Sequence, residues 1–62
     1  MKRAQILETI KQLAKSQGFY GRLLYNLESA ESYNPESYEE FMTELENKNF
    51  SDAVDLVIYL ET

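Results

Sequence analysis

Apolar residues recur at intervals of three and four along almost the whole chain, and this spacing limits what the chain can fold into more than any other feature. The same period appears between Arg3 and Lys15, between Phe19 and Ser29, and between Tyr38 and Leu45. Because it matches the 3.6 residues of a helical turn, each segment should present one apolar side. The sequence therefore predicts an all-α fold of amphipathic helices.

The first two helical segments meet at Ser16-Gln17-Gly18, which predicts a helix end with Gly18 in the left-handed position that often follows one. A heptad rhythm that continues through this region leaves open a single bent helix over residues 3 to 29. Each glycine inside a helix costs about 1 kcal/mol relative to alanine. Two helices with a break near Gly18 are therefore the preferred interpretation.

The clearest signal for a helix boundary lies between residues 32 and 37. Asn34 suits the N-cap position, and Pro35 suits the first helical position, where its missing N–H costs nothing. Glu36 then lies in the first turn, where the helix dipole favours a negative charge. These residues predict a helix that begins at Pro35 and continues to Asn47.

The last segment, from Asp52 to Glu61, is predicted to be a helix with Ser51 as its N-cap. Its β-branched residues also suit a strand, so residues 53 to 60 could adopt either structure. A lone strand without a partner elsewhere in the sequence would be unstable, and a helix is preferred. Apolar residues cover most of the circumference of this helix, which is typical of a helix at the centre of a core or shared with another subunit.

The length of 62 residues allows one domain, so residues 1–62 are predicted to form a single helical domain. We expect three or four short helices joined by loops of roughly two to eight residues and packed antiparallel where the loops are shortest. A chain this short buries only about 60% of the surface that its unfolded form exposes. The thin core and the apolar last helix together favour a homodimer.

The composition excludes several kinds of chemistry. The chain has no cysteine and no histidine, which removes thiol nucleophiles, imidazole bases and the usual zinc, haem and iron–sulfur ligand sets. We therefore expect no enzyme activity, no metal and no cofactor. No apolar run approaches the roughly 20 residues of a membrane span, and no export signal is evident. The predicted location is cytoplasmic, without membrane association.

Charge is strongly divided along the chain. Residues 1–27 carry five basic residues and one acidic residue, whereas residues 28–62 carry one basic and ten acidic residues. The simplest interpretation is that the two halves fold against each other, with the charges at a solvated rim. An electrostatic field produced by such an uneven distribution of charge would also orient the approach of a charged partner.

Residues 17 to 22 form the most unusual stretch, because two glycines, two aromatic residues and an arginine occur together. Aromatic residues and arginine are enriched at interface hot spots, so a protein partner is expected to bind Gln17, Phe19, Tyr20 and Arg22. The alternative is that Phe19 and Tyr20 enter the core. Arg22 is expected to lie exposed beside an aromatic ring and to contribute more to binding than to folding.

The helix that begins at Pro35 carries Glu36, Glu40 and Glu44 at i,i+4 spacing, which predicts a second, acidic contact surface. The ordinary interpretation is a solvated helix face. An acidic surface can also imitate a nucleic acid and inhibit a host defence protein that binds one. A weaker alternative, which we do not expect to hold, is direct binding of nucleic acid through the basic residues of the N-terminal half: Lys2, Arg3, Lys11, Lys15 and Arg22.

The segment from Ile10 to Leu24, the stretch from Glu46 to Val57 and the closing Tyr59, Leu60 and Glu61 resemble short acidic helical proteins encoded by phages and mobile elements of Gram-positive bacteria. Small acidic proteins of that kind include accessory factors and inhibitors of host defence. The resemblance implies such a context for this chain and transfers no site residues. Together with the missing catalytic chemistry, it favours a small non-enzymatic protein-interaction module.

Overall fold

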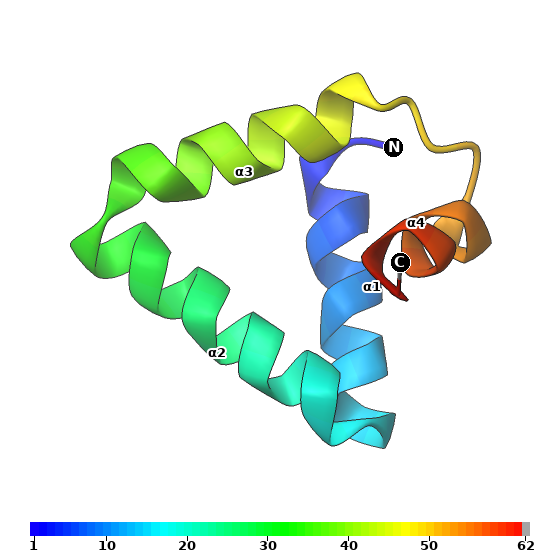
Figure 1. The fold of residues 1–62 in the computed structure, drawn as a ribbon, viewed down its shortest axis with the longest axis horizontal. Helices are drawn as coiled ribbons and strands as arrows, with labels where there is room; N and C mark the ends of the chain where they lie inside the picture. Colours follow the sequence, from blue (N-terminus) through cyan, green and yellow to red (C-terminus); the bar gives the residue numbers. More distant parts are fainter. Residues whose placement is uncertain (62) are drawn as a thin grey trace.

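A computed structural model describes residues 1–61, which form four helices and no strand (Figure 1). The helices are α1 (Arg3–Ser16), α2 (Gly18–Tyr33), α3 (Pro35–Asn47) and α4 (Ala53–Glu61). The all-α prediction is confirmed. Both open alternatives are also decided, because the first half contains two helices and the last segment is helical.

The junction between α1 and α2 consists of one extended residue, Gln17, with φ −138° and ψ 124°. Its N–H donates to the Leu13 carbonyl at 2.9 Å, and its own carbonyl accepts from the Tyr20 N–H at 3.1 Å. Gly18 is already the first residue of α2, and its φ is not positive. The predicted left-handed conformation of Gly18 is wrong, because the extended Gln17 alone redirects the chain.

The junction between α2 and α3 is also one residue long. The helix expected to end at Ser29 continues to Tyr33, and the expected loop shrinks to Asn34. The Asn34 side chain accepts a hydrogen bond from the Ser37 N–H at 3.4 Å. Pro35 follows at the first helical position, so the predicted start of this helix is confirmed.

These two short junctions set the shape of the molecule. Helices that pack side by side have axes about 8–10 Å apart, whereas one residue advances the chain by only about 3.8 Å. Neighbouring helices therefore meet at their ends and then diverge as a V, which Figure 1 shows for α1 with α2 and for α2 with α3. The expectation of antiparallel packing at the shortest loops is wrong for this reason.

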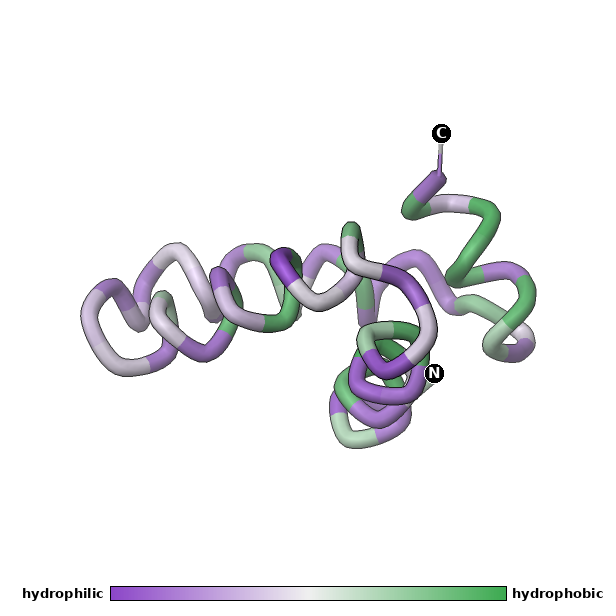
Figure 2. The backbone as a smooth tube through the Cα atoms, turned by 90° about the horizontal axis from the view of Figure 1, so that it is seen from below, coloured by the Kyte–Doolittle hydropathy of each residue, from purple (hydrophilic) through white to green (hydrophobic). Residues whose placement is uncertain are grey.

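The connection from α3 to α4 is longer and contains Asn49, whose φ of 53° lies in the left-handed region. The carboxylate of Asp52 accepts a hydrogen bond from the Asp55 N–H at 3.1 Å, so Asp52 caps α4 in place of the predicted Ser51. In both Figure 1 and Figure 2, α4 stands on the other side of α1 from α2.

All four helices contribute to one small core. Its buried residues are Ile6, Ile10, Tyr20, Leu27, Tyr38, Met42, Leu45 and Leu56. Ile6 and Ile10 of α1 are fully shielded from solvent, as are Met42, Leu45 and Leu56, so the core lies where α3 and α4 pack against α1. No helix among the described residues has both the length and the apolar content needed to cross a membrane.

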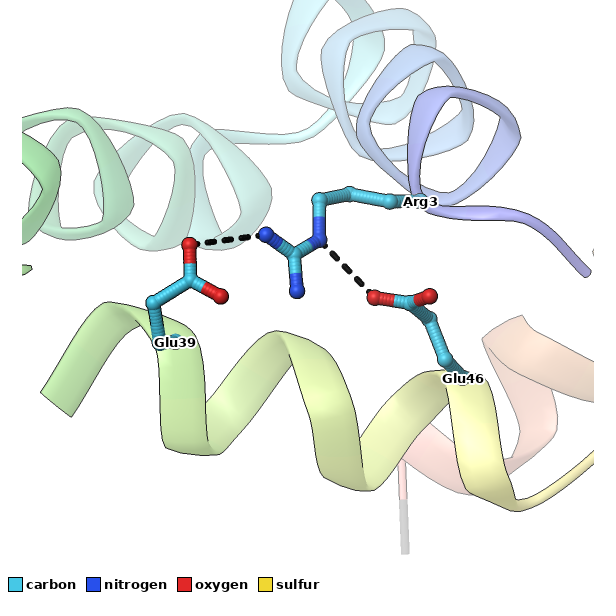
Figure 3. Close-up of polar contacts among 3 residues, drawn as sticks. All are labelled: Arg3, Glu39 and Glu46. Carbon is cyan, nitrogen blue, oxygen red and sulfur yellow. Dashed lines mark hydrogen bonds and ion pairs between the residues drawn. The ribbon is translucent and has the colours of Figure 1, made fainter. Parts of the chain in front are cut away.

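Arg3 ties the start of α1 to α3 (Figure 3). Its Nη1 donates to a Glu39 oxygen and its Nε to a Glu46 oxygen, both at 2.8 Å. These two hydrogen bonds raise the pKa of Arg3 above its usual value. Arg3 belongs to the basic set considered for nucleic acid, but here it joins the basic and acidic halves of the chain.

Candidate functional site

The outer side of α2 carries a shallow hollow of about 370 Å³. Its lining residues follow the three-and-four spacing of one helix side: Phe19, Arg22, Leu23 and Asn26. The Phe19 side chain is 66% exposed, Arg22 and Asn26 are exposed, and Leu23 is half-buried. This feature, called the α2 hollow below, combines an aromatic ring, an apolar side chain, an amide and one cation.

Tyr20 supports the α2 hollow from inside the molecule. It is only 1% exposed, and its ring meets the Phe19 ring edge-on at a centroid distance of 5.2 Å and an interplanar angle of 86°. Its hydroxyl donates to a Glu61 oxygen on α4 at 3.1 Å. Burial, followed by this hydrogen bond and the carboxylate charge, raises the pKa of Tyr20 above its usual value of 10.0. The buried Tyr20 ring thus packs against the exposed Phe19 ring from the core side.

The structure therefore divides the patch predicted from the sequence. Gln17, Phe19 and Arg22 are exposed, whereas Tyr20 belongs to the core. The alternative that both aromatic residues enter the core holds for Tyr20 alone. Arg22 lines the same hollow as Phe19.

Two further residues of this surface, Leu23 and Asn26, lie outside the patch predicted from the sequence. Both are one helical turn from predicted residues, since Leu23 is four residues after Phe19 and Asn26 is four residues after Arg22. Extending the predicted patch along the helix period, instead of along consecutive residues, would have found them.

The predicted acidic surface lies on α3. Glu36, Glu40 and Glu44 are all exposed and follow one another at i,i+4 spacing on the outer side of the helix. This acidic stripe is separate from Glu39 and Glu46, which bind Arg3. At the C-terminal end of the stripe, a Glu44 oxygen accepts a hydrogen bond from the Tyr59 hydroxyl at 3.3 Å.

No cluster of three or more carboxylates within residues 1–61 is arranged to hold a metal ion. The polar groups of the α2 hollow and of the acidic stripe are suited to hydrogen bonds and ion pairs with another molecule.

Comparisons with protein-family models, curated proteins and solved structures found no significant match. The resemblance to small proteins of phages and mobile elements stays a prediction. The function is therefore argued from the geometry of the two surfaces.

Proposed function

We propose that this protein is a non-enzymatic interaction module that binds a partner protein through the α2 hollow. The observation behind the proposal is the exposed Phe19 ring beside Arg22 in a hollow with an apolar floor. Aromatic residues and arginine in a pocket that a partner can desolvate are the usual source of binding energy at interfaces.

The chemistry of the hollow defines the partner segment. Phe19 and Leu23 offer apolar area to a protruding aliphatic or aromatic side chain. Arg22 is the only basic residue between Lys15 and Lys48, so it favours a carboxylate next to that side chain. An exposed ion pair contributes only about 0–1 kcal/mol, but a pair that the partner shields from water contributes more.

The direct test is affinity capture from a lysate of the source cells, followed by titration of each purified candidate. The full chain is compared with Phe19→Ala and Arg22→Ala, and Lys15→Ala on α1 is the matched control for removing an exposed cation. We expect the specific partner to be lost or weakened at least about 30-fold by both hollow variants, as for a hot spot. Lys15→Ala should retain it.

Folding must be measured on the same samples. Arg22 is exposed, so Arg22→Ala should change the free energy of unfolding by less than about 0.5 kcal/mol. Equal capture by the wild type and both hollow variants would refute the proposal, as would a large loss of stability in Arg22→Ala, because Arg22 would then be structural.

The acidic stripe supports the second candidate function, imitation of a nucleic acid. Three carboxylates one helical turn apart give one charge per about 6 Å of helix, whereas one strand of DNA carries a phosphate every 3.4 Å or so. The stripe thus has about half the charge density of a strand, which favours the α2 hollow as the principal site.

Mimicry predicts tight binding to a basic protein, and Glu40→Gln and Glu44→Gln should weaken that binding. Direct binding of nucleic acid would instead appear as affinity for DNA or RNA that falls steeply with salt.

A further inference from the structure

A second surface lies between α1 and α4, where a groove of about 330 Å³ runs along the outside of the molecule. Its lining residues include Thr9, Gln12 and Leu13 on α1 and Val54, Val57 and Ile58 on α4. Val54 is 63% exposed and Ile58 is 56% exposed. Figure 2 shows hydrophobic residues along most of α4. A helix this apolar has only one side covered by the core.

None of these lining residues is charged, although the chain has a net charge of −5. A charged or strongly polar partner would gain little here, because the groove offers it no ion pair. Two copies of the chain repel each other through their net charge, and they come together at the lowest cost where the surface itself is neutral. The groove is such a surface.

We propose that a second copy of this chain covers the α1–α4 groove in a two-fold symmetric dimer. In such a contact each patch meets itself, so it must be self-complementary. Val54 and Ile58, one turn apart, form a ridge on α4, and the groove lies beside it. The ridge of each copy can therefore enter the groove of the other, as in ordinary helix packing.

A dimer contact has to extend beyond the groove itself. The smallest stable interfaces bury about 600 Å² on each partner, roughly one seventh of the 4380 Å² surface of this molecule, and the exposed Val54 and Ile58 continue the apolar surface along α4. None of the named groove residues lines the α2 hollow. The dimer thus stands independently of the proposed partner-binding site.

Sedimentation equilibrium of the full chain, from about 10 μM to about 1 mM, tests the dimer over the affinity range of small interfaces. We expect the mean mass to rise with concentration from the 7.3 kDa of one chain toward twice that value. Ile58→Glu should weaken the association at least about 30-fold. Tyr25→Glu places the same charge on another exposed apolar residue, on α2, and should weaken it much less.

Cysteine cross-linking locates the interface even if Ile58→Glu fails to fold. The chain has no cysteine, so a single Val54→Cys or Ile58→Cys substitution supplies the only thiol. We expect mild oxidation to join two chains through position 54 or 58 faster than through Tyr25→Cys. A mass that stays at one chain up to about 1 mM would overturn the proposal, and so would equal cross-linking at all three positions. Either result would leave the groove to a different protein.

Discussion

At the scale of single residues, the sequence predicts that the start of α2 carries exposed aromatic and basic side chains, but it does not predict every residue that belongs to this surface. Phe19 and Arg22 are exposed as a contact patch requires, but their neighbour Tyr20 is buried. Adjacent residues on a helix point about 100° apart, so one of the two aromatic residues had to turn inward. Tyr20 is the one in phase with the buried Leu27, seven residues later. Its hydroxyl also reaches Glu61 at the end of α4, a contact that local periodicity does not predict.

The buried Tyr20 predicts a loss of stability in alkaline solution. Its pKa is raised in the folded protein, so its contribution is fully present below the unfolded pKa of about 10 and is lost as the pH rises through the higher folded value. Denaturant unfolding of Tyr20→Phe should therefore show less loss of stability between neutral pH and about pH 11. Some loss should remain, because burial also raises the pKa of Tyr38.

The control for this experiment is Tyr25→Phe, which removes the hydroxyl of a tyrosine that is 70% exposed and lies outside the core. Parallel profiles for Tyr20→Phe and the wild type across the alkaline range would show that the ionisation of Tyr20 does not limit stability there.

At the scale of the elements, helix type follows from the sequence and helix ends follow only in part. Periodicity and the Asn34-Pro35 signal are local, and both predictions are confirmed. The extension of α2 from Ser29 to Tyr33 escaped detection because its polar residues weaken the apolar pattern. Ala30 nevertheless packs against the core, and this tertiary contact continues the helix.

Gly18 offers a test of the first junction. A Cβ atom at this position would meet no atom within 4 Å, and the φ of Gly18 is not positive. Gly18→Ala should then stabilise the protein by about 0.4–1 kcal/mol, mainly by restricting the unfolded chain. Thermal or urea unfolding measures the change.

Gly21→Ala is the companion variant, because its Cβ would lie 3.8 Å from the Ala14 carbonyl oxygen, an ordinary contact distance. It should be stabilising by a similar amount in the interior of α2. Destabilisation by Gly18→Ala alone would indicate that Gly18 adopts the left-handed conformation and that the helix break lies there.

At the scale of the whole molecule, the arrangement of the helices was the least predictable feature. The sequence contains both short junctions, but the single-residue length of the second one emerges only because α2 extends to Tyr33. The resulting V-shaped path leaves α4 with an apolar side open. If this side pairs with a second copy, the assembly presents two α2 hollows, and a multivalent partner would bind with avidity beyond that of one hollow.

The small core and the proposed dimer give a joint prediction for Met42, which is fully buried in α3. A domain of 62 residues has a free energy of unfolding of about 3–9 kcal/mol, and Met→Ala in a core costs about 2–5 kcal/mol. Met42→Ala should therefore lower the melting temperature sharply, whereas Met42→Leu, which conserves volume, should cost less than about 1.5 kcal/mol. Since association stabilises only the folded chain, a higher protein concentration should raise the melting temperature of Met42→Ala, as followed by the helical circular dichroism signal. If Met42→Ala melts close to the temperature of the wild type, Met42 is not central to the core. If its melting temperature does not change with protein concentration, dimerisation does not stabilise the fold.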